Sequence, residues 1–324
     1  METFESFGEV LYRVNDRSFI EIALKLFHFQ AKYNSVYSEY IKHLRIRPEA
    51  VESLEQIPYL PVSFFKTHDI KTGSWPTATT FTSSGTTGMI SSRHAVRDLS
   101  FYLNNAARCF SHFYGDPGSY TILALLPSYV ERGGSSLIAM IEDFIRRGSG
   151  GFYHQNRSGL LDALRNSKGK KTILWGVTYA LLDLAEQEEL DLSDCIVIET
   201  GGMKGRRAEI TRTELHEFLT KRFNTPKIHS EYGMTELLSQ AYSRGEGLFE
   251  CPPWMKIVLR DPEDPRDMNP KRERGGINII DLTNFNTCAF IETQDLGRLG
   301  QTGYFEVLGR MDNSDIRGCN LLVE

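Results

Sequence analysis

The sequence predicts an α/β fold, in which a mostly parallel sheet covered by helices is followed by a β-rich C-terminal part. Three observations support this prediction. Apolar residues recur at helical spacing over residues 17–45. From about Ser119 onward, strand-like and helix-like segments alternate, as in a parallel sheet. Beyond about Gly247, short apolar runs are separated by Pro, Asn, Asp and Gly, as in an antiparallel sheet.

The individual elements follow from these patterns in chain order. Residues 17–45 are expected to form one or two amphipathic helices, and the run Ile-Pro-Tyr-Leu-Pro at 57–61 ends that pattern. The alternating region is expected to contain strands at 120–126, 171–177, 195–199 and 226–230, and helices at 135–147, 179–189, 206–222 and from Thr235 onward. The β-rich part is expected to contain strands at 257–259, 277–280, 288–291 and 304–308. We therefore divide the chain into an α/β body with N-terminal helices at 1–246 and a β-rich part at 247–324.

Composition and charge exclude several classes of protein. The chain has 324 residues, of which 40% are hydrophobic and 24% charged, as in a soluble globular protein. A formal charge of -5 without any Lys/Arg block gives no reason to expect a nucleic-acid partner. No apolar run is long enough to span a bilayer, and the acidic N-terminus is unlike a signal peptide. We therefore expect a cytoplasmic protein.

The cysteines and histidines give no metal or disulfide pattern. Five cysteines are scattered without a Cys-x-x-Cys pair, which argues against a disulfide framework and a zinc site and favours a reducing compartment. Cys109, Cys195 and Cys288 are interpreted as core residues, and the role of Cys251 stays open. His229 is interpreted as a buried, hydrogen-bonded histidine rather than a base.

One Ser/Thr/Gly-rich run indicates a phosphate-binding loop. Residues 82–88, which are Thr82, Ser83, Ser84, Gly85, Thr86, Thr87 and Gly88, combine five hydroxyl side chains with two glycines. Glycine lets the backbone approach a ligand closely, and exposed amides and hydroxyls donate hydrogen bonds to phosphate oxygens. The run is not a Walker A motif, because no Gly-Lys-Ser/Thr follows. A surface loop without a ligand is the alternative.

Three further segments place a carboxylate or hydroxyl beside glycine, two of them after a predicted strand and one in the β-rich part. They are 199–203, 231–236 and 293–298. In open parallel sheets ligands bind beyond the carboxyl ends of the strands, so these segments are candidates for a binding site. A helix cap at Thr235 and Glu236 and a simple turn at 295–297 are the alternatives.

The order of four motifs along the chain resembles that of the adenylate-forming superfamily, which includes acyl-CoA synthetases and aryl-CoA ligases. The motifs are Ser84-Gly85-Thr86-Thr87-Gly88, Tyr232-Gly233-Met234-Thr235-Glu236, Asp295, and Gly309-Arg310-Met311-Asp312 with Ile316-Arg317-Gly318. The resemblance implies the fold of that superfamily's N-terminal domain, with parallel-sheet subdomains and a β-rich part that binds ribose and ends at the hinge region.

The resemblance also implies a role for each motif toward ATP and Mg²⁺. The loop from Thr82 to Gly88 would hold the β- and γ-phosphates of ATP. Tyr232, followed by Gly233, would stack on adenine, Thr235 would bond the α-phosphate, and Glu236 would hold Mg²⁺. Asp295 would bind the ribose hydroxyls with help from Arg310, and Gly201 and Gly202 would line the adenine and acyl pocket.

Two departures from the superfamily pattern matter. The phosphate loop of the superfamily usually continues Gly-x-Pro-Lys, whereas here Met89-Ile90-Ser91-Ser92-Arg93-His94 follows Gly88. Arg93 or His94 would then have to supply the missing cation. Only twelve residues follow Asp312, so we expect the mobile C-terminal domain, with its catalytic lysine, to be absent.

Segments 57–66, 126–132 and 199–207 resemble the acyl-protein synthetase (LuxE) family, and this resemblance covers the chain from about residue 55 to its end. In that family a fatty acid is adenylated and the acyl group moves to a cysteine near the C-terminus. Cys319 occupies the corresponding position, and Arg310 and Arg317, nearby in sequence, would lower the pKa of its thiol. A small core residue is the alternative for Cys319.

The expected function is therefore ATP-dependent activation of a carboxylic acid, a fatty acid above all, to an acyl-adenylate. The acyl group would pass to Cys319 or to a partner, which could be an acyl-acceptor protein, a carrier protein or a reductase. One alternative is an acyl- or aryl-CoA ligase that delivers directly to coenzyme A or a carrier protein. The other is a non-catalytic scaffold that binds a nucleotide or an acyl group.

Overall fold

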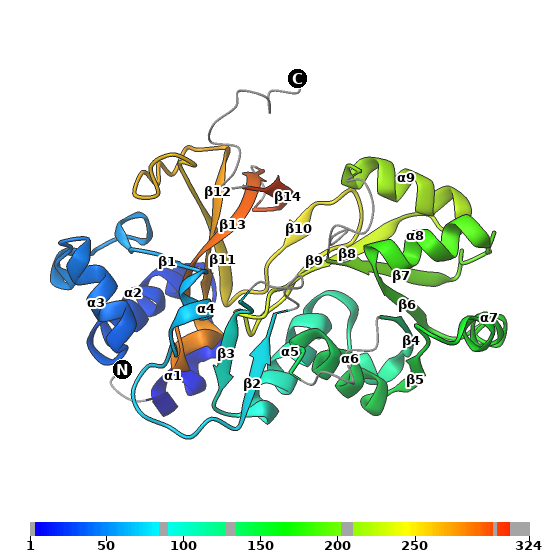
Figure 1. The fold of residues 1–324 in the computed structure, drawn as a ribbon, viewed down its shortest axis with the longest axis horizontal. Helices are drawn as coiled ribbons and strands as arrows, with labels where there is room; N and C mark the ends of the chain where they lie inside the picture. Colours follow the sequence, from blue (N-terminus) through cyan, green and yellow to red (C-terminus); the bar gives the residue numbers. More distant parts are fainter. Residues whose placement is uncertain (1–3, 84–89, 127–133, 202–209, 301–302, 312–324) are drawn as a thin grey trace. The chain divides into compact units, whose positions relative to one another are not determined.

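The computed structural model describes residues 4–83, 90–126, 134–201, 210–300 and 303–311. The chain forms two compact units, one built from Met1–Ser74 with Pro253–Glu324 and the other from Trp75–Pro252 (Figure 1). The division drawn from the sequence at 246–247 grouped the N-terminal helices with the α/β body. In the structure, residues 1–74 instead pack with the C-terminal strands.

The unit Trp75–Pro252 contains a mostly parallel sheet. Its strands lie in the order β5-β4-β6-β7-β8-β9-β10. The parallel strands are β4 (Thr121–Leu125), β5 (Ser149–Phe152), β6 (Thr172–Val177), β7 (Cys195–Thr200) and β8 (Ile228–Tyr232), and the antiparallel ones are β9 (Ala241–Ser243) and β10 (Phe249–Glu250). A separate hairpin joins β2 (Thr79–Thr82) and β3 (Arg93–Val96).

Helices cover both faces of this sheet (Figure 1). The helices of the unit are α5 (Leu99–Tyr114), α6 (Ser136–Arg147), α7 (Arg157–Arg165), α8 (Thr178–Gln187) and α9 (Arg212–Arg222), with a 3-10 turn at Pro117–Ser119. Helices α5 and α6 pack against each other, as do α8 and α9. Trp175 of β6 meets the rings of Phe110 on α5 and Phe144 on α6. Because side chains alternate along a strand, the next residue along each strand points to the α8 and α9 side.

The unit that holds both chain ends contains an antiparallel sheet. Its strands β11 (Met255–Arg260), β12 (Arg274–Asp281), β13 (Phe290–Leu299) and β14 (Phe305–Arg310) lie in that order, and β1 (Leu60–Pro61) pairs in parallel with β13. The helices are α1 (Phe4–Val10), α2 (Asp16–Tyr33), α3 (Ser35–His43) and α4 (Phe64–Thr67), with 3-10 turns at Leu11–Arg13, Pro48–Ala50, Leu54–Gln56 and Leu282–Asn286.

Buried groups from distant parts of the chain tie the N-terminal helices to this antiparallel sheet. Phe27 of α2 packs edge-on against Phe290 of β13, with ring centroids 6.0 Å apart. The Gln30 amide donates to the carbonyl oxygen of Asn284 at 2.9 Å, and its oxygen accepts from the Ala289 N–H at 2.9 Å. Asn34 ends α2 and caps α3, because its side-chain oxygen accepts from Tyr37 N at 3.0 Å. The expected helical region at 17–45 is thus two helices.

The predicted alternation of strands and helices is confirmed, but β5 and α7 were not expected, and two expected helices differ. Helix α9 begins at Arg212, where Thr211 forms a capping box with Glu214, rather than at residue 206. The prediction of a helix from Thr235 is wrong, because the chain turns there, with Leu237 N bonded to Met234 O, and returns as β9. Asn105 of α5 donates to Leu238 O at 2.8 Å and holds this segment in the interior. The four expected strands of the β-rich part are confirmed as β11 to β14.

Among the described residues no helix has both the length and the apolar character needed to cross a membrane.

Candidate active site

Two of the sequence-predicted segments meet at the carboxyl edge of the parallel sheet. Strands β7 and β8 are neighbours, with Glu199 paired to Ser230 and Thr200 paired to Glu231. Gly201 follows β7 with a φ of 72°, a left-handed conformation that glycine adopts without strain. Ligands of open parallel sheets bind at this edge, so the register brings Gly201 and the segment from Tyr232 to Glu236 to the expected place.

Glu199 lies on the α8 and α9 side of the sheet, where its carboxylate is fully satisfied. Its oxygens accept from Thr178 Oγ1 at 3.1 Å and from Arg212 Nε at 3.3 Å, and His216 Nε2 lies 3.6 Å away. Burial by itself raises the pKa of Glu199, but the His216 hydrogen bond and the Arg212 charge outweigh it and lower the pKa overall. Glu199 is therefore an ionised, internally paired group.

Glu231 lies on the opposite side of the sheet and has no cation among its described contacts. Its carboxylate accepts a short hydrogen bond from Thr200 Oγ1. Burial above all, together with the nearby Glu199 charge, raises the pKa of Glu231 to about 7 against the lowering effect of the Thr200 bond. This carboxyl group thus titrates near neutral pH.

The segment from Tyr232 to Glu236 is fixed by contacts from β8, β3 and β10. The Tyr232 ring meets Phe249 edge-on, with centroids 5.9 Å apart. A Cβ at position 233 would lie 2.3 Å from Glu231 Oε1, so only glycine at this position avoids a clash with the Glu231 carboxyl group. The Thr235 carbonyl oxygen accepts from His94 Nδ1 at 2.8 Å, and Glu236 is buried.

The hairpin β2–β3 frames the Ser/Thr/Gly-rich run, of which residues 84–88 lie outside the described residues. Thr82 pairs with Arg93, and the Ser83 N–H donates to Ser92 O at 3.1 Å. His94 is fully buried, and this burial lowers its pKa to about 4, so the imidazole is neutral at physiological pH. His94 is therefore not the replacement cation that the sequence allowed. Arg93 is exposed and remains the candidate.

In the unit that holds both chain ends, the structure brings Asp295 and Arg310 together. Strands β13 and β14 place the two residues opposite each other, and Arg310 Nε lies 3.7 Å from Asp295 Oδ1. Arg310 also donates to Gln294 Oε1 at 3.4 Å. The Asp295 side chain is mostly covered, whereas that of Arg310 is 71% exposed. Fifteen positions apart in sequence, these two predicted ribose-binding residues form one pair.

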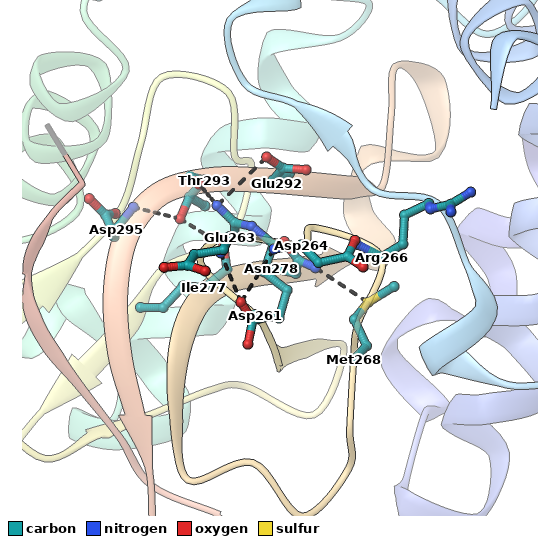
Figure 2. A network of polar contacts seen from close by, with 11 residues as sticks. Asp261, Glu263, Asp264, Arg266, Met268, Ile277, Asn278, Glu292, Thr293 and Asp295 are labelled. Atoms are coloured by element: carbon teal, nitrogen blue, oxygen red, sulfur yellow. Dashed lines mark hydrogen bonds and ion pairs between the residues drawn. The ribbon is translucent and has the colours of Figure 1, made fainter. Parts of the chain in front are cut away.

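A buried arginine, Arg260, orders the strand that carries Asp295, and Figure 2 shows the Asn278, Thr293 and Asp295 side chains of this network. Arg260 donates to Asn278 Oδ1 at 2.9 Å and to the Thr293 carbonyl oxygen at 2.7 Å. The Thr293 hydroxyl in turn accepts from the Asp295 N–H at 3.0 Å. A Cβ at Gly276 would lie 2.6 Å from Arg260 Cζ, so the glycine leaves room for the guanidinium. Arg260 thus holds the backbone of Thr293, and the Thr293 hydroxyl in turn holds the backbone N–H of Asp295.

Two further predicted site residues, Cys319 and Gly202, lie outside the described residues. The described part contains no group of three or more His, Cys, Asp and Glu side chains that could hold a metal ion. A single buried carboxylate such as Glu236 nevertheless fits Mg²⁺, which is often held by one or two carboxylates together with substrate phosphates.

Several residues around these groups were missed by the sequence interpretation. They are Arg212, His216, Gln240 and Tyr242. The alternation of side chains along β8 could have indicated that Glu231 and Tyr232 point to opposite faces. Nothing in the sequence indicated that β9 returns beside β8.

Comparisons with known proteins identify the fold. No family model matches the sequence, and no curated protein is significantly similar to it. A solved structure of 2-hydroxyisobutyryl-CoA ligase with 2-HIB-AMP and CoA has a TM-score of 0.70 at 16% identity, covering 92% of this chain and 68% of the ligase. The chain therefore has the α/β fold of the N-terminal domain of adenylate-forming enzymes.

Two other solved structures share this fold. ATP-bound MatB from Rhodopseudomonas palustris has a TM-score of 0.56 at 17% identity over 74% of this chain. The O-succinylbenzoate coenzyme A synthetase MenE from Bacillus subtilis, in complex with ATP and a magnesium ion, has a TM-score of 0.53 at 20% identity over 72% of this chain. The chain spans 49% of the MatB structure and 50% of the MenE structure.

Proposed function

We propose that this protein activates a carboxylic acid with ATP and forms an acyl-adenylate and pyrophosphate. One observation carries the proposal: a fold shared with acid–CoA ligases has the motif residues Tyr232, Thr235 and Glu236 at the carboxyl edge of its parallel sheet. Pairing of Asp295 with Arg310 adds support, because the two together suit a ribose. Solved structures with this fold hold ATP, a magnesium ion or an acyl-AMP.

In the proposed reaction a carboxylate oxygen of the acid attacks the α-phosphorus of ATP. The bond from that phosphorus to the bridging oxygen breaks, and pyrophosphate leaves. Thr235 would donate to the α-phosphate and Tyr232 would stack on adenine, while Asp295 and Arg310 would hold the ribose. Mg²⁺ at Glu236 would supply positive charge that offsets the charge on the transferring phosphoryl group.

We further propose that the acid is a fatty acid and that the acyl group then moves to Cys319, as in the acyl-protein synthetase (LuxE) family. The thiolate sulfur would attack the acyl carbon and release AMP. This step rests on the resemblance of the sequence. Delivery to coenzyme A or a carrier protein is the second candidate, and it is favoured by the CoA bound in the ligase structure of the same fold.

Acid-dependent exchange of labelled pyrophosphate into ATP tests the adenylation step. We expect exchange with at least one acid of a broad panel, and a loss of about 100-fold in Thr235→Val, because a donor to the transferring phosphate is removed. Thr213→Val is the matched control, since Thr213 is exposed on α9 in the same unit. Absence of exchange with every acid would favour the non-catalytic scaffold.

Mass spectrometry of the intact protein after incubation with ATP, Mg²⁺ and a mixed acid pool tests the transfer step. A hydroxylamine-labile acyl group is expected on the wild type and is expected to be lost in Cys319→Ser. If the acyl group persists in that variant, Cys319 is not the acceptor. Acyl-CoA formed without any acylated protein would favour the ligase alternative.

A further inference from the structure

Three polar side chains gather on the α5 and α6 side of strands β8 and β9. Glu231 and Tyr242 are directly opposite each other in the antiparallel pair, so their side chains lie on one face. Gln240 lies two residues before Tyr242. A Cβ at Gly233 would lie 3.4 Å from Gln240 Cγ and 2.3 Å from Glu231 Oε1, so both side chains border the bare backbone of Gly233.

These side chains are buried, yet their polar atoms are incompletely bonded. Glu231 is 8% exposed, Gln240 4% and Tyr242 1%. Within the described part of the chain, neither the Gln240 side-chain oxygen nor the Tyr242 hydroxyl has a hydrogen-bond partner. Most buried polar groups in proteins are paired, because desolvation without a partner is costly. Two unpaired atoms on one face therefore leave hydrogen-bonding capacity that a ligand could use.

The same residue types are fully bonded elsewhere in this chain. The buried Gln30 donates to the Asn284 carbonyl oxygen and accepts from the Ala289 N–H, each at 2.9 Å. The buried Tyr102 hydroxyl donates to the Ser136 carbonyl oxygen at 2.9 Å. The Gln240 oxygen and the Tyr242 hydroxyl thus differ from the same groups of Gln30 and Tyr102.

We propose that Glu231, Gln240 and Tyr242 form a site for a hydrogen-bond-donating group, a hydroxyl or an ammonium, on the acid substrate. An amide oxygen only accepts a hydrogen bond, the ionised form of Glu231 likewise, and a tyrosine hydroxyl can do either, so the three together suit a donating group. An unsubstituted fatty acid would leave them unpaired. The proposal rests on the proposed adenylation function and narrows the proposed fatty acid to one that carries a hydroxyl or an amino group.

The place of the site along the chain supports this assignment. Glu231 directly precedes Tyr232 and Gly233, and the turn after Gly233 leads to Thr235, which would hold the α-phosphate. The carboxylate of the acid must reach that phosphate, so the rest of a small acid lies close to it. A polar substituent on such an acid would then meet Glu231 and Gln240.

Denaturation of the ligand-free protein tests whether the two atoms are unpaired. We expect Gln30→Leu and Tyr102→Phe to lower the urea midpoint, because each loses a buried hydrogen bond. Gln240→Leu loses only the 3.5 Å bond from its Nε2 to the Leu238 carbonyl oxygen, and Tyr242→Phe loses none, so neither should lower the midpoint as far as Gln30→Leu. A fall in Gln240→Leu as large as that in Gln30→Leu would mean that the atom is already satisfied, by bound water or otherwise, and would overturn the proposal.

Titration calorimetry without ATP tests the ligand chemistry. The probes are hexanoic acid and its α-hydroxy, ω-hydroxy and ω-amino derivatives, with the butanoic series as a second length. We expect at least one substituted acid to bind about tenfold more tightly than its parent, since an unpaired buried acceptor gains a partner. Gln240→Leu should abolish that preference. Glu231→Gln should abolish a preference for the amino derivative and keep one for the hydroxy derivative.

Three results would overturn the proposal: a parent acid that binds as tightly as its derivatives, a preference that persists in Gln240→Leu, or no binding of any probe. The pyrophosphate exchange assay separates this proposal from the proposed function. Preferential binding without exchange would remove the adenylation function and keep the site. Exchange with unsubstituted fatty acids alone would keep adenylation and remove the site.

Discussion

Glu199 and Glu231 end neighbouring strands of one sheet, and both are buried, yet they lie in opposite environments. Glu199 points to α9, where Arg212 and His216 lower its pKa against the effect of burial. Glu231 points to α5, where Tyr102 and Tyr242 offer no charge, and burial raises its pKa to about 7. Charged partners on α9 therefore keep Glu199 ionised, whereas burial without a cation among the described contacts raises the pKa of Glu231.

The two faces of the sheet also differ in how completely their buried polar groups are hydrogen-bonded. On the Glu199 side, Thr178, Arg212, His216 and Ser230 form a closed network. On the Glu231 side, Gln240 and Tyr242 retain unpaired atoms among the described residues. We interpret the first face as a structural support of the sheet edge and the second as the face that meets a ligand.

The largest effect on stability is expected from Glu199→Leu. It leaves Arg212 and His216 without their buried partner, which we expect to lower the free energy of unfolding by about 4 kcal/mol. Glu188→Leu is the matched control, since Glu188 pairs with Arg157 at the surface and should cost less than about 1 kcal/mol. Urea denaturation at pH 7.5 measures both. Equal losses in the two variants would show that the Glu199 network contributes no more than a surface pair.

The second effect is a dependence of stability on pH that comes from Glu231. Its pKa is about 7 in the folded protein against an ordinary value of 4.5. The folded state therefore binds the proton more tightly than the unfolded chain. The contribution of Glu231 is complete below pH 4.5 and is lost as the pH rises to about 7, by about 3 kcal/mol.

Glu231→Gln removes this dependence, so the stability of the wild type relative to the variant should fall between pH 4.5 and 7. Glu199→Gln should remove a dependence of stability on pH that has the opposite sign. Its pKa is lowered by folding, so its contribution is present above the ordinary pKa and is lost as the pH falls. Denaturant unfolding across this pH range measures both variants. Parallel curves for wild type and Glu231→Gln would contradict the raised pKa.

The smallest effect is expected from Thr200→Val, which removes the hydroxyl that donates to Glu231. We expect a loss of about 1 kcal/mol in the free energy of unfolding, because one buried hydrogen bond is lost. Since that bond lowers the pKa of Glu231, the pKa should rise further in the variant. Carboxyl carbon chemical shifts followed by NMR titration measure the pKa. An unchanged value would show that Thr200 does not set the ionisation of Glu231.

Local sequence patterns predicted much of the fold. The apolar spacing of Phe19, Ile22 and Leu26 is repeated on the buried face of α2, and the run at 172–177 is β6. The helix expected from Thr235 failed because tertiary contacts override the local pattern: Asn105 binds the Leu238 carbonyl oxygen, and the chain returns as β9 beside β8. The hairpin β2–β3 was missed because four-residue strands carry a weak periodic signal.

The candidate site divides in the same way. The sequence by itself determined the order of the motifs, from the Thr82 loop through Tyr232 to Asp295 and Arg310, because motif order is a property of the chain. The tertiary structure alone decided that His94 is neutral, that Arg260 supports Asp295, and that Gln240 borders Gly233. The ionisation and hydrogen bonding of a buried group depend on side chains that folding brings from distant segments, and sequence spacing does not specify those neighbours.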